Sequence, residues 1–359
     1  MIPYWLLFSY FAAGALQSAS EASSARQGQA LLIVGALITA ILIGLRYDVG
    51  GDWENYEFIF YTLQYSTFAQ AAAQIDPGYA ALNVIAHKLG LGIWFVNVIC
   101  AILFTWGLTR FIRRQPLPWL AFTISIPYLV TVVAMGYTRQ AVAISLILVA
   151  LEAYDRKSFI AFVVAIVAAA AFHKSAVLLV PFAGISAGRN RSLVLLSSAI
   201  FALFLYWVFV ASSVDQLTIN YTTGELQSEG AFVRVGMSIV PAVLFLAYQR
   251  RFAFNEQSRK LWRNFAIAAL LAVIPLLAAP NLSTAVDRLA LYLIPLQIVV
   301  LSRLPIVFYG KAARGLDWTA LITLYSGTVL YVWLTYATHS QYWLPYKSYL
   351  FVNAANSPY

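Results

Sequence analysis

The sequence predicts an all-α integral membrane protein with about 11–12 membrane helices, two of them forming a broken helical hairpin. Hydrophobic residues make up 62% of the 359 positions and charged residues only 10%, whereas a soluble domain carries about 25% charged residues. Apolar runs recur along the whole chain, many of them close to the roughly 20 residues that a spanning helix needs. We therefore expect a single transmembrane domain over residues 1–359.

The apolar runs give the expected spans in order. No basic residue precedes the first run, so we expect a retained span there rather than a cleaved signal peptide. The run Phe159–Ile185 is interrupted at His173, and we interpret it as a hairpin of two short helices. The runs are Ile2–Leu16, Ala30–Leu45, Leu91–Leu108, Leu117–Ala134, Ala141–Tyr154, Phe159–Ile185, Leu193–Ser213, Val235–Gln249, Phe265–Ala279, Leu289–Ser302 and Trp318–Tyr336.

Basic residues set the expected topology, because cytoplasmic loops of membrane proteins are enriched in Lys and Arg. The hairpin, with its tip at His173, brings the clusters around Arg110, Arg156, Arg250 and Arg303 to the cytoplasmic side. The opposite, periplasmic face then receives a loop at 46–78, which contains an interfacial helix at Trp53–Tyr65, and a tail at 338–359. The net charge of +9 is explained by these basic loops, so no nucleic-acid partner is expected.

The loop that follows Leu45 is the most polar stretch near the start of the chain. Arg46, Asp48 and Asp52 arrive within seven positions, with Gly50 and Gly51 between the two acids. Because each glycine costs a helix roughly 1 kcal/mol relative to alanine, we expect the helix to end near Arg46 and the chain to turn at the glycines. We expect Asp48 to pair with an arginine, and Asp52 to face a cavity as the preferred general base.

Isolated cations on the periplasmic side suggest a binding site. Charges this close to the hydrocarbon are costly and usually face a protein interior or a watery cavity, although each one alone fits a residue that snorkels from a helix end. Arginine binds phosphate groups bidentately, lysine binds them as a point charge, and tyrosine rings offer platforms for sugars. The single cysteine, Cys100, lies in an apolar run, and no metal-ligand spacing, nucleotide loop or nucleophile motif is present, so no metal or cofactor is expected.

An ordered set of motifs resembles the EpsG family of bacterial membrane proteins. The motifs are Arg46-Tyr47-Asp48-Val49-Gly50-Gly51-Asp52 with Tyr56, Asp76-Pro77-Gly78-Tyr79, Arg139-Gln140, Phe172-His173-Lys174-Ser175-Ala176, Asp287-Arg288 with Tyr292, and Pro345-Tyr346-Lys347. The resemblance implies a Wzy-like polysaccharide polymerase of the bacterial inner membrane, similar to the multi-span GT-C glycosyltransferases. The usual family form of the second motif has Glu at the position of Asp76.

The resemblance also implies a substrate, and from it and the residues we infer a reaction and the roles of individual side chains. The substrate would be an undecaprenyl-diphosphate-linked oligosaccharide, joined at the periplasmic face without a metal, with a chain-length regulator as a further partner. A hydroxyl of the incoming unit would displace undecaprenyl diphosphate from the growing chain. The expected catalytic residues are Asp52, Asp48 and His173, with His173 the second choice as base. The expected substrate-binding residues are Arg46, Arg139, Gln140, Lys174, Asp287, Arg288, Tyr56, Asp76, Tyr79, Tyr292, Tyr346 and Lys347.

Two other functions use the same kind of site. A flippase for lipid-linked sugars would need charged groups deep in several spans and often shows inverted repeats, and the sequence has few such groups and no repeat. A periplasmic ligase or acyltransferase that moves a glycan or an acyl group to another acceptor remains open on chemical grounds. Products formed from a single lipid-linked substrate would distinguish a polymerase from all of these.

Overall fold

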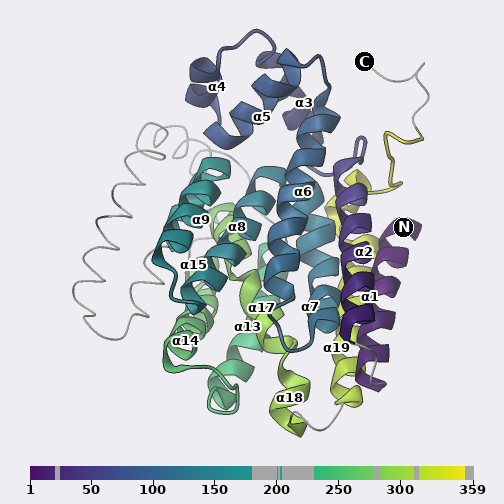
Figure 1. The fold of residues 1–359 in the computed structure, drawn as a ribbon, viewed down its shortest axis with the longest axis vertical. Coiled ribbons are helices and arrows are strands. Elements are labelled where there is room, and N and C mark those ends of the chain that lie inside the picture. The colour runs from purple at the N-terminus through teal and green to yellow at the C-terminus, as the bar shows by residue number, and fades with distance from the viewer. Residues whose placement is uncertain are drawn as a thin grey trace.

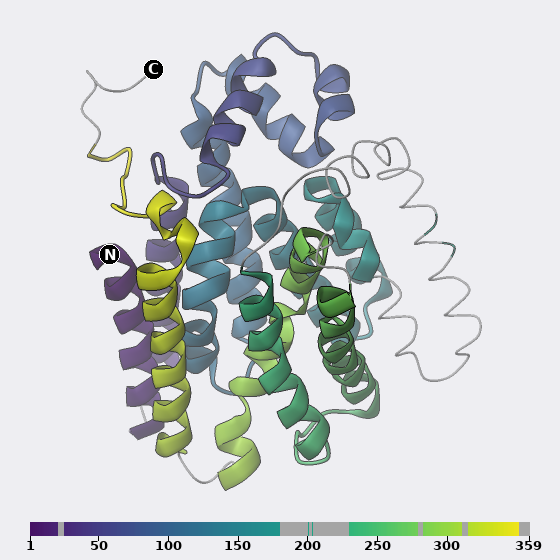
Figure 2. The same ribbon diagram turned by 180° about the vertical axis from the view of Figure 1, so that it is seen from behind.

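The computed structural model describes residues 1–20, 25–179, 200, 203, 230–278, 283–310 and 315–351. Within these ranges the chain is a bundle of helices without a β-strand, as predicted (Figures 1 and 2). Helix is the expected solution for a chain in lipid, because every backbone polar group is then satisfied within its own segment.

The helices of the bundle overlap the predicted runs, although some extend beyond them, as Glu256–Ala278 does beyond Phe265–Ala279. The described part of the chain has five helices long and apolar enough to cross a membrane, at Gln27–Gly44, Ile93–Ile112, Ala231–Tyr248, Glu256–Ala278 and Val286–Tyr309, and two shorter apolar ones at Pro118–Ala134 and Phe159–Phe172. Helices α1, α8 and α19 run beside them (Figure 1). The predicted span at Leu193–Ser213 lies outside the described residues, so the total of 11–12 remains a prediction.

The element bounds are as follows. The first half contains α1 (Ile2–Ser20), α2 (Ala25–Gly44), α6 (Ile93–Ile112), α7 (Pro118–Ser125), the π-helix η1 (Ile126–Ala134), α8 (Thr138–Asp155), α9 (Phe159–Phe172) and the 3₁₀ helix η2 (Lys174–Leu179). The second half contains α13 (Ala231–Tyr248), α14 (Glu256–Leu271), α15 (Val273–Ala278), α16 (Ser283–Ala290), η6 (Leu291–Leu293), α17 (Ile294–Leu301), α18 (Leu304–Tyr309), α19 (Leu316–Tyr336) and η7 (Thr338–Tyr342).

Three short helices cover one end of the bundle (Figure 1). They are α3 (Trp53–Thr62), α4 (Phe68–Gln74) and α5 (Pro77–Lys88), and we call them the cap helices. The predicted interfacial helix is present as α3, and it buries Trp53, Tyr56 and Phe60 at helical spacing. Thr67 and Gln70 form a capping box that starts α4. The loop predicted at 46–78 is therefore more helical than expected.

Charged residues separate by bundle end in the way the charge pattern predicts. At the end opposite the cap helices, Glu152 accepts from Arg110 at 2.7 Å and lies 3.3 Å from both Arg114 and Arg156. At the cap end, Asp52 and Asp76 lie beside Arg288 and Arg139. We call the end that contains Glu152 and its arginines the basic end, and the end covered by the cap helices the cap end.

The tail packs against the loop at 45–52 and holds it in place. The backbone N–H of Gly50 donates to the Tyr342 carbonyl at 2.8 Å, and that of Tyr47 donates to the Lys347 carbonyl at 3.0 Å. Trp343 is buried and its Nε1 donates to the Thr131 carbonyl in η1 at 2.8 Å. The tail and the loop at 45–52 thus form one unit at the cap end, although residues 352–359 of the predicted tail lie outside the described part.

The predicted hairpin is observed in its first half. Helix α9 ends at Phe172, and His173 takes an extended backbone (φ −156°, ψ 115°) before η2 begins. His173 lies near Arg139 and Arg288 and therefore at the cap end. The returning half of the hairpin and Arg189 lie outside the described residues.

Candidate functional site

Two arginine–carboxylate pairs lie side by side at the cap end. Arg139 Nη1 lies 2.9 Å from Asp76 Oδ2, and Arg288 Nη2 lies 3.8 Å from Asp52 Oδ2. The pairs come from four elements: Arg139 begins α8, Asp76 precedes α5, Arg288 lies on α16, and Asp52 precedes α3. The charges of both arginines act on Asp52, so the two pairs form one cluster. We call it the paired cluster.

Arg139 is held by aromatic side chains of the cap helices. Its guanidinium carbon lies 5.9 Å from the ring centres of both Tyr56 and Tyr79, a cation–π geometry. Asp76 stands at the N-cap of α5 but makes no side-chain cap hydrogen bond, because its carboxylate binds Arg139 instead. Arg139 Nε is buried without a hydrogen-bond partner in the described part of the chain, and a quarter of the side chain is exposed.

Arg288 is positioned by Tyr137, which precedes α8, and by Gln140 on the first turn of α8. Its guanidinium carbon lies 4.4 Å from the centre of the Tyr137 ring. Gln140 Nε2 donates to the Arg288 carbonyl at 2.6 Å, which fixes the main chain of α16 against the start of α8. The side chains of Arg288 and Asp52 are each 29% exposed, so both can be reached from outside the protein.

The two carboxylates of the paired cluster differ in how firmly they are held. Burial raises the pKa of Asp52, while the nearby charges of Arg288 and Arg139 oppose this shift. Burial also raises the pKa of Asp76, against the opposing effects of Arg139 and Lys174. Asp76 is committed to a close contact with Arg139, whereas Asp52 is more loosely paired and more exposed. Asp52 is therefore the better placed of the two to accept a proton from a substrate.

His173 belongs to a group of three hydrogen-bonding side chains beside the paired cluster. Its Nδ1 lies 2.7 Å from the Ser175 hydroxyl, which lies 2.9 Å from the Tyr292 hydroxyl. Burial, together with the positive charges of Arg139, Arg288 and Lys174, lowers the pKa of His173 to about 3. His173 is consequently neutral at physiological pH.

Arg234 is a member of the site that the sequence reasoning missed. It lies on the first turn of α13, and its Nε forms an ion pair with Asp287 Oδ1. Asp287 is buried and held in this pair, so it is less available to a substrate than the sequence suggested. Like Arg139 and Arg288, Arg234 lies close to the start of an apolar run, and that position is the signal that could have found it.

Arg46 has a structural role, which corrects the expectation that it binds the diphosphate. Its side chain is 1% exposed. The guanidinium donates to the carbonyls of Ile43 at 2.6 Å and Val49 at 3.2 Å, and to the side chains of Thr138 at 2.7 Å and Asn97 at 3.4 Å. Because α2 ends at Gly44, its last carbonyls need donors, and Arg46 folds back to provide one.

Asp48 pairs with Lys347 of the tail, so the prediction of an arginine partner is wrong. Both side chains are about half exposed, and Asp48 adopts a left-handed backbone with φ 49°. Tyr346 donates to the Leu42 carbonyl at 2.8 Å. The tail returns antiparallel to Arg46 through a bridge at Ser348, and this pairing brings Lys347 rather than an arginine to Asp48. Asp48, Tyr346 and Lys347 thus connect the tail to the loop.

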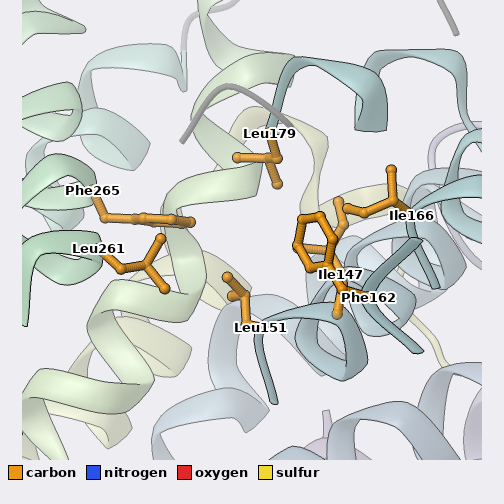
Figure 3. A pocket seen from close by; sticks show the side chains of 8 residues that line it. Ile147, Leu151, Phe162, Ile166, Leu179, Leu261 and Phe265 are labelled. Atoms are coloured by element: carbon orange, nitrogen blue, oxygen red, sulfur yellow. The ribbon is translucent and has the colours of Figure 1, made fainter. Parts of the chain in front are cut away.

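A small apolar pocket lies apart from the paired cluster. The pocket in Figure 3 lies between α8, α9, η2 and α14, and all eight of its lining residues, among them Ile147, Phe162 and Phe265, are apolar. It is therefore separate from the paired cluster.

Among the described residues, no group of three or more His, Cys, Asp or Glu side chains is placed to hold a metal ion. Metal independence stays a prediction.

Comparison with known proteins identifies the family. The model of the EpsG family matches residues 6–348, which is nearly the whole chain. The comparisons with curated proteins and with solved structures found no match, so the predicted similarity to GT-C glycosyltransferases is untested. The five long apolar helices and the family together make this a multi-pass inner-membrane protein. The chain belongs to the EpsG family, a membership that points to a polymerase of exopolysaccharide biosynthesis.

Proposed function

We propose that the protein joins undecaprenyl-diphosphate-linked oligosaccharide repeat units at the periplasmic face of the inner membrane. The observation that carries this proposal is the paired cluster, where two partly exposed arginines and a carboxylate with a raised pKa meet at the end of the bundle opposite the basic end. By the positive-inside pattern, the basic end is cytoplasmic and the cap end periplasmic.

Arg139 and Arg288 are suited to hold a diphosphate. Each is fixed by an aromatic ring and retains about a quarter or more of its side chain exposed, so each can be reached from outside the protein. A guanidinium binds phosphate oxygens through paired N–H donors. Helices α5 and α8 also begin at this point, and helix N-termini favour anions. A membrane-anchored substrate can present its diphosphate here while its lipid stays in the bilayer.

The proposed reaction is one displacement at the anomeric carbon of the lipid-linked growing chain. A hydroxyl of the incoming unit forms the new glycosidic bond, and the bond between the anomeric carbon and the diphosphate breaks. Asp52 accepts the proton of that hydroxyl, for which its raised pKa is favourable. Arg139 and Arg288 stabilise the charge that develops on the departing undecaprenyl diphosphate. The Tyr56 and Tyr79 rings are buried and hold Arg139, whereas the Tyr137 ring beside Arg288 is partly exposed and can offer an apolar face to a sugar.

Purified protein incubated with one lipid-linked repeat unit tests this function. A ladder of lengthened lipid-linked products from the wild type, absent in Arg139→Ala and Arg288→Ala, is the expected result. Arg113→Ala, at an exposed arginine of the basic end, is the matched control and should retain the ladder. Transfer only to a second kind of acceptor would indicate a ligase, and movement of the substrate across vesicles without lengthening would indicate a flippase.

A further inference from the structure

The Tyr292–Ser175–His173 group is the part of the site that the proposed reaction does not yet use. These side chains come from two regions far apart in the sequence, η6 and the residues that follow α9. The Ser175 hydroxyl lies between its two partners, 2.9 Å from the Tyr292 hydroxyl and 2.7 Å from His173 Nδ1. The Tyr292 hydroxyl is also 3.4 Å from Nδ1. Two hydroxyl groups thus converge on one ring nitrogen.

We propose that Ser175 and Tyr292 hold His173 in the tautomer with its proton on Nε2, so that this N–H is a neutral donor to the diphosphate. The inference rests on the proposed function for the identity of the anion. Its structural half, the tautomer, is argued from the hydrogen-bond geometry and can be tested without any substrate. Ser175 and Tyr292 are positioning residues in this account, because they act on the substrate only through His173.

The arrangement at Nδ1 fits a nitrogen without a proton. An unprotonated Nδ1 has one lone pair for the closer hydroxyl, that of Ser175 at 2.7 Å, and the Tyr292 hydroxyl, 3.4 Å from Nδ1, lies closer to Ser175 Oγ at 2.9 Å. With Nδ1 as acceptor, the Tyr292 hydroxyl donates to Ser175 Oγ and the Ser175 hydroxyl donates to Nδ1. The ring proton then sits on Nε2, which makes no hydrogen bond to the described part of the chain.

The charges around His173 decide against its role as a general base. Arg139 on α8, Arg288 on α16 and Lys174 on η2 all act on the ring, and each disfavours a second proton on it. The carboxylates of Asp52 and Asp76 are already paired with these two arginines. A neutral imidazole that presented a lone pair to a diphosphate would be repelled, while an N–H is attracted. His173 therefore adds a third donor beside the two guanidiniums.

Substitution by glutamine separates the two roles of His173. A glutamine amide carries an N–H near the position of Nε2 but cannot act as a base. His173→Gln should retain chain formation within about tenfold of the wild type, while His173→Ala should lose more than His173→Gln. Ser175→Ala should lower kcat by about five- to tenfold, the effect of one neutral hydrogen bond, with little change in KM. Ser175→Thr, which keeps the hydroxyl, should restore most of the rate.

Nitrogen NMR of the purified protein with ¹⁵N-labelled histidine reads the tautomer directly. The chain has three histidines, and the His173→Gln variant assigns the signal of His173 by difference. The expected result is an unprotonated Nδ1 and a protonated Nε2 at neutral pH, and a mixture of tautomers in Ser175→Ala. A protonated Nδ1, or a ring that titrates near neutral pH, would overturn the proposal. Absence of a ladder from the wild type would contradict the proposed function without changing the NMR result.

Discussion

Gly50 offers a sharp test of how the loop at 45–52 positions Asp52. Gly50 has φ +111°, a backbone region that side chains rarely allow, and a Cβ there would overlap the Met135 carbonyl oxygen and lie 3.1 Å from Gly136 Cα. We expect Gly50→Ala to disrupt the loop. Its neighbour Gly51 is the matched control, because a Cβ at Gly51 would meet only the Trp343 ring at 3.7 Å, an ordinary contact.

The magnitude follows from the strain and the displacement. Backbone strain at a position of this kind costs about 1–3 kcal/mol, and loss of the hydrogen bond from Gly50 N–H to the Tyr342 carbonyl adds about 1 kcal/mol. Relief of the overlap needs a shift of roughly 1 Å, and a misplacement of that size near the chemistry costs about 100-fold in rate. We therefore expect Gly50→Ala to lose about 2–4 kcal/mol of stability and about 100-fold in rate.

Two measurements check this prediction, the thermal midpoint of unfolding in detergent and the rate of ladder formation from a lipid-linked repeat unit. Gly50→Ala should be impaired in both, and Gly51→Ala should stay close to the wild type in both. Equal stability and equal rates for the two alanine variants would show that the loop does not constrain Asp52, and would refute the reasoning.

Three further predictions concern the charged side chains. Asp52→Asn should bind lipid-linked substrate but lose turnover, which separate binding and rate measurements check. Because burial raises the pKa of Asp52, the activity of the wild type should fall on acidification at a higher pH than for an ordinary aspartate, which a pH–rate profile checks. Arg139→Lys and Arg288→Lys should recover little of the activity lost in the alanine variants, since a point charge lacks the paired donors, and retention of most activity in both would argue against a diphosphate site. Asp48→Asn should keep near wild-type activity and lose at most about 1 kcal/mol in thermal unfolding, because its pair with Lys347 is half exposed; loss of turnover would return Asp48 to the catalytic residues.

The sequence by itself determined the class of the protein and the approximate positions of its apolar helices. Apolar runs separated by charged residues leave a chain in lipid one way to satisfy its backbone, as helices, so the bundle follows from composition. The end of α2 before Arg46, the turn at Gly50 and the break at His173 were also predictable, because glycine pairs and polar residues disfavour helix locally. Arg139, at the start of α8, and Arg288, just before the apolar run at Leu289–Ser302, were found for a related reason, since a charge at the end of an apolar run is visible in the sequence.

Only the tertiary structure decided which charge meets which. Asp48 and Lys347 are 299 positions apart, and Gln140 and Arg288 are 148 apart, so no local rule could pair them. The same applies to two of the four hydrogen bonds of Arg46, those to Asn97 and Thr138, which depend on how α6 and α8 approach the end of α2. A charged side chain at a helix end can face a substrate or complete the protein's own hydrogen bonds, and packing alone selects between these outcomes. That is why Arg46 is buried and committed to the fold, while Arg139 and Arg288 remain partly exposed at the cap end.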